Sequence, residues 1–542
     1  MTKWNSDKIA KGGNTLKSNI VKYIFVIFVI AIMGFAIYKL NQDEKQKETE
    51  ETPVIESVDE EIIKEITLGI AEFDTINPII SGNKHVQEIS KIIYDSLLEV
   101  DEEYKIQKNL AKDWAKTSDV TYLFKLREDV KWSDGQPFTA DDVIFTIDIL
   151  KQIPSIYGYN VQYVVRADKI DSYTVQLTLD HEIPFFEYNL IFPIMSKVYF
   201  EGQDFVATEK NNMPVGTGKY KIIKNDGEGI TLAKNENYTR EELTLETITI
   251  GKYANLGELY NAFKLGKIDL ITTNNIKIEE NIGNIGYNVK ETMGREYDFL
   301  AINTQSNVLS HKEVRKAIAY AINKENIVAT LYNNKYKVQT YPLDYGNYLK
   351  GEKDDMTYNV EKAKQTLEQN GWIFKNTKWQ KVENYRTKTL NFKLVVQANN
   401  GIRVTVADMI KANLEEIGIK VTIVKASDSQ YQYYLDNKNY DMILTGITQT
   451  GSPNLERFFG VNNLSNYNNE EVSTIINEVK NITKEDMLKQ KYERLRKIYN
   501  EEVPFIGLYN SYYAIMSAWN FKGNITANWY NIFMDINNWY KN

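Results

Sequence analysis

The sequence predicts a mixed α/β protein that follows one N-terminal membrane-spanning segment. Three observations support this prediction. The run from Tyr23 to Tyr38 contains no charged residue. The segments TYLFKLRE (Thr121–Glu128) and YTVQLTLD (Tyr173–Asp180) alternate apolar and polar residues, as half-buried strands do. A strand, a helix and a second strand follow one another between Leu390 and Val424, which indicates parallel strands joined by a right-handed crossover.

The first 40 residues are predicted to form a cytoplasmic tail (1–19) and a single-pass membrane anchor (20–40). A span needs about 17 to 25 apolar residues, and the uncharged run reaches that length if the Lys22 amine extends to the headgroups. Five lysines against one aspartate in residues 1–22 predict a cytoplasmic N-terminus, with the rest of the chain extracellular or periplasmic. The alternative is a cleaved signal peptide, because Gly34-Phe35-Ala36 offers small residues at a spacing suited to cleavage.

Residues 41–64 are predicted to form a solvated linker. The stretch from Asn41 to Glu65 holds ten acidic residues against three lysines and contains a single proline. Such a composition buries too little apolar surface to fold alone. The globular part is therefore expected to begin near Glu65, outside the membrane.

Composition excludes several classes of function. The 542-residue chain has a net charge of -8, so no broad basic face is available for phosphate backbones and we expect no nucleic acid partner. The absence of cysteine excludes disulfides, thiolate zinc sites and a cysteine nucleophile. The three histidines, His85, His181 and His311, are far apart in the sequence. The sequence therefore indicates no metal site and no cofactor.

The first predicted elements follow directly from Glu65. EITLGI (Glu65–Ile70) alternates as a strand, and a loop rich in turn formers leads to an amphipathic helix around Val86–Leu98. Further along, Ser310 and Glu313 have the spacing of a capping box before an apolar helical face.

A β-α-β unit is predicted near the C-terminal third of the chain. Leu390–Gln397 and Ile419–Val424 have the composition of buried strands, and Val404–Ile417 between them has helical periodicity. Gly418 is expected to end the helix, because glycine tolerates the left-handed backbone of a helix C-terminus.

An acidic cluster in KWSDGQPFTADDVIFTIDIL (Lys131–Leu150) allows two interpretations. Four aspartates there suggest carboxylate or metal chemistry. However, Asp134-Gly135 is a turn signal, and Thr139 with Asp142 three residues later is a helix N-cap pattern. Acidic residues also favour the positive end of a helix. We expect the cluster to be a turn followed by a capped helix.

The run LAKDWAKTSDVTYLFKLREDVKWSDGQPFTADDVIFTI (Leu110–Ile147) closely resembles the signature of the family 5 extracellular solute-binding proteins, the peptide- and nickel-binding receptors of ABC importers. Other landmarks follow in that family's order: FDTINPIIS (Phe73–Ser81), PVGTGKYKI (Pro214–Ile222), NENY (Asn235–Tyr238), FLAINTQ (Phe299–Gln305), EVRKAIAYAINKENIV (Glu313–Val328) and YDMILTG (Tyr440–Gly446). The resemblance covers nearly everything from Glu65 to Trp539.

The resemblance implies a two-lobed clamp of the periplasmic-binding-protein type (type II) with an extra domain. The implied parts are lobe I (65–95, 213–298 and 517–542), the extra domain (96–212) and lobe II (299–516). The lobes would close around strands near Arg295–Asn303 and Ser517 and hold the ligand between them. A closed monomer would deliver a peptide or another small solute to the membrane permease subunits of an importer. No covalent chemistry is needed, so the resemblance implies a binding protein and not an enzyme.

The chain departs from the family pattern at one ligand-binding segment. Peptide-binding members typically carry an Asp, in a stretch similar to ADYxDP, that pairs with the ligand's α-amino group. This chain has ITQTGSPN (Ile447–Asn454) there, and no carboxylate occurs from Met442 to Leu455. Either another acid, such as Asp344, Asp428 or Glu456, supplies the charge, or the ligand lacks a free amine. A modified peptide, an oligosaccharide or a metal chelate is therefore an alternative ligand.

Candidate ligand contacts follow from position along the resemblance. They are Thr75, Asn77, Arg295, Tyr297, Asn303, Tyr341, Thr448, Gln449 and Asn454. For Arg295, a solvated or structural ion pair is an alternative to binding a ligand carboxylate. With 37 tyrosines in the chain, most of them must lie in the core or on the surface without contacting a ligand. Two other functions stay open, namely a receptor that senses its ligand without importing it and a secreted hydrolase.

Overall fold

The computed structural model describes Met33 and residues 62–283, 286–343, 356–482, 484–526 and 528–542. Residues 62–542 belong to one compact unit. The predicted tail (1–19) lies outside the described residues. So do the predicted anchor, apart from Met33, and residues 41–61 of the predicted linker. Within the described ranges, no helix is both long enough and apolar enough to cross a membrane.

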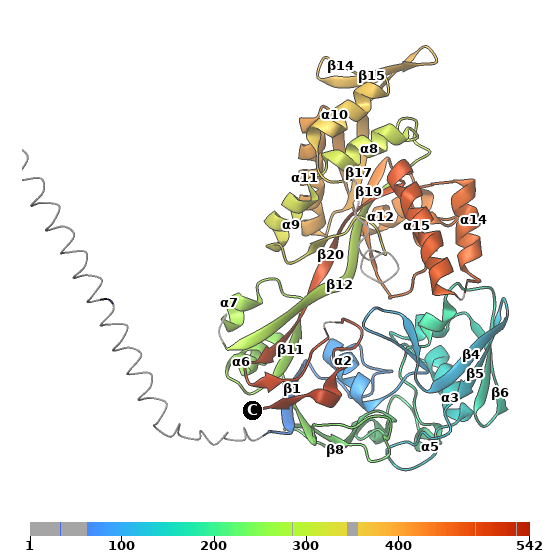
Figure 1. Cartoon of the computed structure of the whole chain (residues 1–542), viewed down its shortest axis with the longest axis vertical. Helices are drawn as coiled ribbons and strands as arrows, with labels where there is room; N and C mark the ends of the chain where they lie inside the picture. Colours follow the sequence, from blue (N-terminus) through green and yellow to red (C-terminus); the bar gives the residue numbers. More distant parts are fainter. Residues whose placement is uncertain (1–32, 34–61, 284–285, 344–355, 483, 527) are drawn as a thin grey trace, which may run out of the picture. The chain divides into compact units, whose positions relative to one another are not determined.

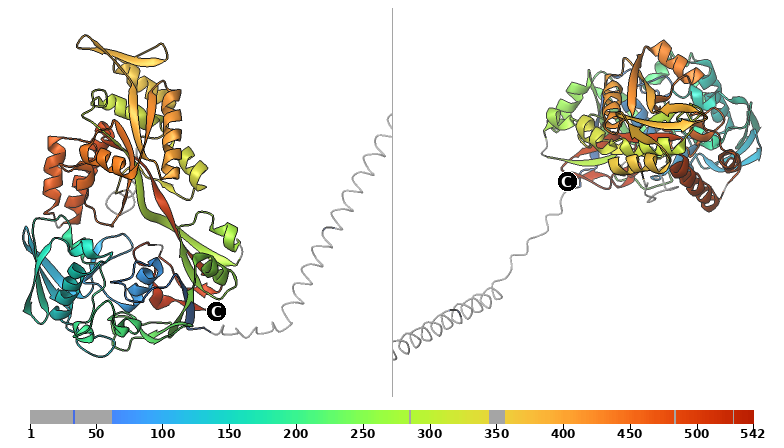
Figure 2. Two further views of the ribbon diagram at one scale, coloured as in Figure 1. Left: turned by 180° about the vertical axis from the view of Figure 1, so that it is seen from behind. Right: turned by 90° about the horizontal axis from the view of Figure 1, so that it is seen from above.

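Two long strands, β12 (Tyr287–Ile302) and β20 (Phe505–Ala518), run antiparallel through a seven-stranded sheet. The strand order is β11-β20-β12-β19-β17-β18, and β13 also pairs with β20. The other strands are β11 (Leu270–Thr273), β13 (Lys337–Val338), β17 (Asn391–Gln397), β18 (Lys420–Ala426) and β19 (Met442–Thr448). Figures 1 and 2 show β12 and β20 side by side from opposite directions, running from the green elements to the yellow and orange ones. The predicted boundary between residues 298 and 299 falls inside β12, and the domain boundaries stay predictions.

The predicted β-α-β unit is confirmed. Strands β17 and β18 are parallel, with Asn391 opposite Lys420 and Gln397 opposite Ala426. The connecting helix α11 (Gly401–Glu416) begins three residues earlier than predicted, because the Asn400 side chain caps it by accepting from the Arg403 N–H. Gly418 follows the helix with φ +84°, a conformation that favours glycine.

Helices pack around the part of the sheet that contains β17, β18 and β19. They are α8 (Lys312–Ala321), α9 (Lys324–Tyr332), α10 (Val360–Gln369), α12 (Asp428–Asn437), α13 (Glu456–Phe459), α14 (Glu470–Val479) and α15 (Glu485–Glu502). In α15, Leu488, Tyr492, Leu495 and Tyr499 recur at helical spacing and are buried in the same apolar core as β12 and β19. A small antiparallel sheet follows α10, made of β14 (Ile373–Lys375), β15 (Lys378–Glu383) and β16 (Arg386–Thr389).

The predicted capping box at Ser310 and Glu313 is wrong. Helix α8 begins at Lys312 with His311 as its N-cap. Ser310 belongs to the preceding turn, where its N–H donates to Ser306 O (2.9 Å) and its hydroxyl donates to Asn307 O (3.3 Å). The Glu313 carboxylate lies 3.4 Å from His311 Nδ1 instead of capping the helix. The spacing of Ser310 and Glu313 does not show that Ser310 forms its hydrogen bonds within the preceding turn, before the helix starts.

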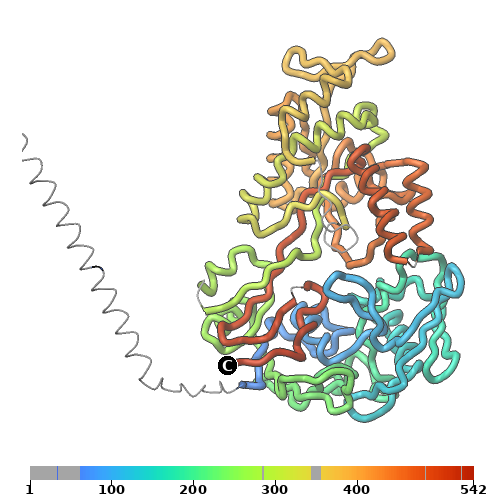
Figure 3. Tube along the Cα trace, in the orientation of Figure 1, coloured from blue at the N-terminus to red at the C-terminus, as the bar shows by residue number. Residues whose placement is uncertain are grey.

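A four-stranded sheet begins the globular part. Its order is β1-β10-β9-β8, formed by β1 (Glu65–Ala71), β10 (Thr247–Tyr253), β9 (Gly229–Lys234) and β8 (Tyr220–Asn225). The helices beside it are α2 (Lys84–Ile93) and α6 (Leu256–Lys264), and α7 (Ile278–Ile282) packs against α6. The C-terminal strands β21 (Phe521–Lys522) and β22 (Tyr540–Lys541) return to β1, because Ile63 pairs with Lys541. Figure 3 shows this red C-terminal segment beside the blue start of the globular part.

The helix predicted around Val86–Leu98 lies earlier in the structure. The Asn83 side chain accepts from the His85 and Val86 N–H groups and starts α2 at Lys84. The helix ends at Ile93, where Tyr94 is extended and the Ile93 carbonyl accepts from the Gly218 N–H (2.9 Å). Leu98 instead begins a short strand, β2 (Leu98–Val100).

A second four-stranded sheet is entirely antiparallel, with the order β4-β5-β7-β6. It contains β4 (Ala111–Ser118), β5 (Thr121–Leu126), β7 (Thr174–Leu179) and β6 (Val164–Asp171). The strands predicted at Thr121–Glu128 and Tyr173–Asp180 are therefore confirmed as β5 and β7. Around this sheet lie α3 (Ala140–Gln152), α4 (Gly158–Val161), α5 (Lys197–Phe200), two 3-10 turns (Phe186–Asn189 and Glu209–Asn212) and β3 (Ile106–Lys108), which pairs with β2.

The acidic cluster at Lys131–Leu150 is a turn and a capped helix, as predicted. Gly135 has φ +89° in the turn, and Thr139 caps α3 in a capping box with Asp142. The buried Asp142 carboxylate accepts from the N–H groups of Thr139 (2.8 Å) and Lys197 (2.9 Å). The acid thus ties the start of α3 to a segment 55 residues away in sequence.

Replacing Asp142 with alanine is expected to lower the free energy of unfolding by about 2–3 kcal/mol, because buried backbone donors lose their acceptor and the helix loses its cap. Urea titration of the full-length protein measures this change. Asp148→Ala is the matched control, since Asp148 is exposed on the same helix, and it should change stability by less than about 0.5 kcal/mol. Equal effects of the two substitutions would contradict the structural role of Asp142.

Candidate functional site

A cavity of about 560 Å³ lies where α2, β12, β20 and the C-terminal segment meet. Its volume is within the range of about 300–1,000 Å³ that is usual for small-molecule sites. The described lining residues come from eight stretches of chain: Lys84, Gln87, Glu88, Lys91; Ile156, Tyr157, Tyr159, Asn160; Tyr188, Asn189, Ile191; Asn274; Gly294, Arg295, Glu296; Thr450; Ser511, Tyr512, Tyr513; Trp529 and Tyr530. We call this space the main cavity.

A bulge in β12 directs two charged residues into the main cavity. Met293 pairs with Tyr512 and Tyr297 pairs with Asn510, so the three residues Gly294–Glu296 lie opposite Ser511 alone. Gly294 permits the close approach of the strands, because a Cβ there would lie 2.3 Å from Ser511 Oγ. The same Ser511 hydroxyl accepts from the Glu296 N–H (3.1 Å). The extra residues of the bulge thus carry Arg295 and Glu296 to the cavity wall.

Helix α2 contributes one polar face to the main cavity. Lys84, Gln87, Glu88 and Lys91 recur at helical spacing and line the cavity, while the apolar residues between them are buried. The Glu88 carboxylate accepts from Thr272 Oγ1 (2.8 Å) and the Tyr513 hydroxyl (2.8 Å). This face therefore brings ionisable groups against a largely aromatic wall.

Lys91 is the most deeply placed of these charges. Its ammonium lies 3.9 Å from the centre of the Tyr530 ring and 3.5 Å from the Ile191 carbonyl oxygen. Burial lowers the pKa of Lys91 to about 7, nearby Glu99 opposes this shift, and the positive charge of Arg295 adds to it. Lys91 is therefore a group whose charge changes near neutral pH.

The aromatic residues at the C-terminus are held in place by a buried asparagine. Asn528 is fully buried, its Oδ1 accepts from the Tyr530 N–H (2.7 Å), and its amide donates to Asp101 O (3.2 Å). Trp529 stacks on Tyr104, with ring centres 5.0 Å apart. The guanidinium of Arg295 lies 4.6 Å from the centre of the Trp529 ring. A ligand in the main cavity would thus meet rigid ring faces.

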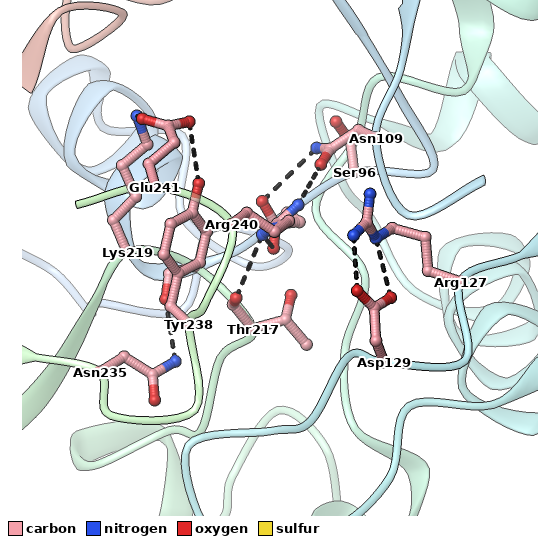
Figure 4. Close-up of polar contacts among 12 residues, drawn as sticks. Ser96, Asn109, Arg127, Asp129, Thr217, Lys219, Asn235, Tyr238, Arg240 and Glu241 are labelled. Atoms are coloured by element: carbon pink, nitrogen blue, oxygen red, sulfur yellow. Dashed lines mark hydrogen bonds and ion pairs between the residues drawn. The ribbon is translucent and has the colours of Figure 1, made fainter. Parts of the chain in front are cut away.

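Residues of the landmarks PVGTGKYKI and NENY take part in a polar network centred on Arg240, which follows NENY by two residues. Arg240 donates to Asn109 Oδ1 (2.6 Å), to the Thr217 carbonyl (3.4 Å) and to the Asp95 carboxylate (Figure 4). In the same network, the Asn235 amide donates to Gly218 O (2.9 Å). Burial and the neighbouring Asp95 charge raise the pKa of Glu99 to about 7. These landmark residues have structural roles, and they shape the charge environment of α2.

A smaller cavity of about 220 Å³ lies at the carboxyl end of β19 and shares Thr450 with the main cavity. Thr448, Gln449 and Asn454, three of the predicted contacts, line it. Gln449 is buried, donates to Pro342 O (3.1 Å) and accepts from the Asn510 amide (3.1 Å). The Arg295 Nε also donates to Gln449 O (3.1 Å), so the two cavities meet at this residue pair.

The structure brings four of the nine predicted contacts to these cavities. Arg295 lines the main cavity, and Thr448, Gln449 and Asn454 line the smaller one. The other five, Thr75, Asn77, Tyr297, Asn303 and Tyr341, line neither of the two. The assignment of these nine residues as ligand contacts stays a prediction.

Hydrogen bonds and packing explain where these five lie. Asn77 is fully buried and donates to Asn211 Oδ1 (2.8 Å), and Thr75 accepts from the Asn77 N–H (3.2 Å). Asn303 donates to Lys438 O (3.2 Å). Tyr297 and Tyr341 are fully buried in the core that contains β12 and β19. The position of a residue in the sequence does not show whether its side chain faces a cavity or the protein interior.

Among the described residues, the acids that line the main cavity are Glu88 and Glu296, and neither was predicted. Of the predicted acids, Asp344 lies outside the described residues. Asp428 accepts from the Gln397 amide (2.7 Å), and Glu456 lies 3.0 Å from Lys480 Nζ. Glu296 instead lies directly opposite Thr448 across the β12–β19 pair and accepts from its hydroxyl (2.9 Å). The strand register, which the sequence does not show, places a carboxylate beside the segment that lacks one.

Comparisons with known proteins agree on one family. The family model described as bacterial extracellular solute-binding proteins, family 5 Middle, matches residues 105–469. The chain is 24% identical over 465 residues to the oligopeptide-binding protein AppA of Bacillus subtilis, covering 81% of this chain and 85% of the relative. It is 24% identical over 481 residues to heme-binding protein A of Haemophilus influenzae, covering 80% and 84%.

Solved structures show the same two-lobed fold. HbpA2 from Haemophilus parasuis aligns with a TM-score of 0.72 and 21% identity, covering 86% of this chain and 98% of that one. The unliganded open form of MppA, a periplasmic murein tripeptide binding protein, aligns with a TM-score of 0.75 and 17% identity, covering 89% and 98%. The family match over most of the globular part identifies the chain: it belongs to the bacterial extracellular solute-binding proteins of family 5.

Proposed function

We propose that the protein captures peptides reversibly in the main cavity and delivers them to the membrane subunits of an ABC importer. The observation that carries this proposal is the cavity itself, which has charges of both signs, Arg295 and Lys91 against Glu296 and Glu88, within aromatic walls. A peptide with free ends carries one charge of each sign and apolar side chains between them. Its ends need partners when water is excluded, and both kinds of partner are present here. Capture is expected to need no covalent chemistry.

We assign Glu296 as the residue that binds the free α-amino group of the peptide. This carboxylate is exposed at the cavity wall and accepts from the Thr448 hydroxyl alone among the contacts of the described side chains. Glu88, by contrast, is engaged with Thr272, Tyr513 and Lys84. Glu296 thus has room to accept from an ammonium group, and it supplies the charge that the segment after β19 lacks.

The N-terminal segment is proposed to anchor the protein in the cell membrane, with the binding region outside. Support comes from the uncharged run Tyr23–Tyr38 and the lysines that precede it. An anchor would keep the binding region at high effective concentration near the importer.

Native mass spectrometry of the full-length protein, purified under non-denaturing conditions in detergent, tests capture and anchoring together. We expect a complex that releases peptides upon collisional activation, and a protein mass that retains the N-terminal segment. A protein mass that begins near Ile37 would contradict the anchor. Release of a sugar or a metal chelate in place of peptides would contradict peptide capture.

Glu296→Gln is expected to weaken binding of pentapeptides with a free α-amino group about tenfold, because the ammonium loses a charged acceptor. Binding of the same pentapeptides after N-acetylation should not change. Competition between the two libraries, measured by native mass spectrometry, gives both values. Glu291→Gln is the matched control, since Glu291 is exposed on the same strand, pairs with Lys335 (2.5 Å) and does not line the cavity. An equal loss for acetylated peptides would show that Glu296 does not bind the amine.

A further inference from the structure

Two cations of the main cavity have no carboxylate partner in the part of the chain that the structure describes. Among the described residues, neither Lys91 nor Arg295 lies within 4.0 Å of an acidic oxygen. The polar contacts of their cationic groups are with backbone carbonyls, Ile191 O for Lys91 (3.5 Å) and Gln449 O for Arg295 (3.1 Å). Positive groups that are partly desolvated usually have an anionic partner in the folded protein.

The two cations belong to one local environment. Their aromatic partners, Trp529 for Arg295 and Tyr530 for Lys91, are adjacent in the chain. Both line the main cavity, and the charge of Arg295 is close enough to disfavour the charged form of Lys91. Like charges held together against ring faces repel each other, and an anion between them would remove this repulsion.

Among the described residues, the other charges in and behind the cavity do not supply that anion. Glu88 lies 3.4 Å from Lys84 Nζ and accepts two hydroxyl hydrogen bonds. Glu296 follows Arg295 in the bulge, where its carboxylate accepts from Thr448. Behind the cavity, Asp95 is paired with Arg240. Glu99 acts on Lys91 from more than 4.0 Å away, and burial and the Asp95 charge raise the pKa of Glu99 to about 7, which weakens its negative charge near neutral pH. The anion is therefore expected to come from the ligand.

We propose that Lys91 and Arg295 together bind the C-terminal carboxylate of the captured peptide. This inference rests on the proposed function and adds the orientation of the peptide within the same cavity. The free N–H groups of a guanidinium suit a carboxylate with two oxygens, and the ammonium of Lys91 supplies a second charge. The stacked rings hold both groups in place before the ligand arrives.

Protonation of Lys91 follows from this arrangement. The charged groups that act on Lys91 are Glu99 on β2 and Arg295 on β12, and the Tyr530 ring lies against its ammonium. Glu88 on α2 and Tyr157 line the same cavity. In the free protein the pKa of Lys91 is about 7, and a bound carboxylate would raise it. Binding should therefore take up protons around neutral pH. The affinity for the peptide should fall as the pH rises above the pKa of Lys91 in the free protein.

The test uses the full-length protein and a pentapeptide library without Asp or Glu, so that the only carboxylate is the C-terminal one. The same library with C-terminal amides is the comparison. By native mass spectrometry, the wild type is expected to bind the acids at least about tenfold more tightly than the amides. Lys91→Met and Arg295→Gln should each lose most of this preference, while Lys264→Met, on the exposed end of α6, should keep it.

Calorimetry of the tightest-binding acid, in two buffers of different ionisation enthalpy at pH 7.5, adds a readout on the unmodified protein. The wild type should take up a fraction of a proton upon binding, and Lys91→Met should take up none. Equal binding of acids and amides by the wild type would overturn the carboxylate site and leave peptide capture intact. Binding of neither library would contradict both proposals.

Discussion

The antiparallel pairing of β12 and β20 is the constraint on which the rest of the structure depends. Strand β20 also pairs with β11 near Ser517 and with β13 further along, and β12 pairs with β19 on its other side. Three residues of β12 lie opposite one residue of β20 in between. A regular ladder would direct alternate side chains to opposite faces, whereas the bulge exposes Arg295 and Glu296 side by side. The site thus exists because the pairing is interrupted at this point.

Not all charged side chains of the main cavity have an oppositely charged partner among the described residues. Asp298, two residues after Glu296, has a partner in Arg403, with contacts of 2.6 and 2.9 Å. That pair is internal to the sheet and its helix, and it leaves no group for a ligand. Arg295 and Lys91 have ring faces and carbonyl oxygens as neighbours instead. This contrast separates charges that stabilise the fold from charges that remain available for binding.

Much of the local structure could be predicted from the sequence. Periodicity located β1, β5, β7 and the β17-α11-β18 unit, and the turn and cap signals identified the acidic cluster as structural. These features depend on residues close together in the chain. The capping box at Ser310 failed because its turn uses a backbone contact that the pattern does not encode.

The sequence by itself determined the fold class, the family and the neighbourhood of Arg295 and Gln449, because motifs and periodicity are properties of consecutive residues. Only the tertiary structure decided that Tyr297 and Tyr341 face the core and that Lys91 and Glu296 face the main cavity. The physical reason is that a wall made from α2, the β12 bulge and residues 529–530 depends on strand register and long-range packing. No stretch of the chain contains that information by itself.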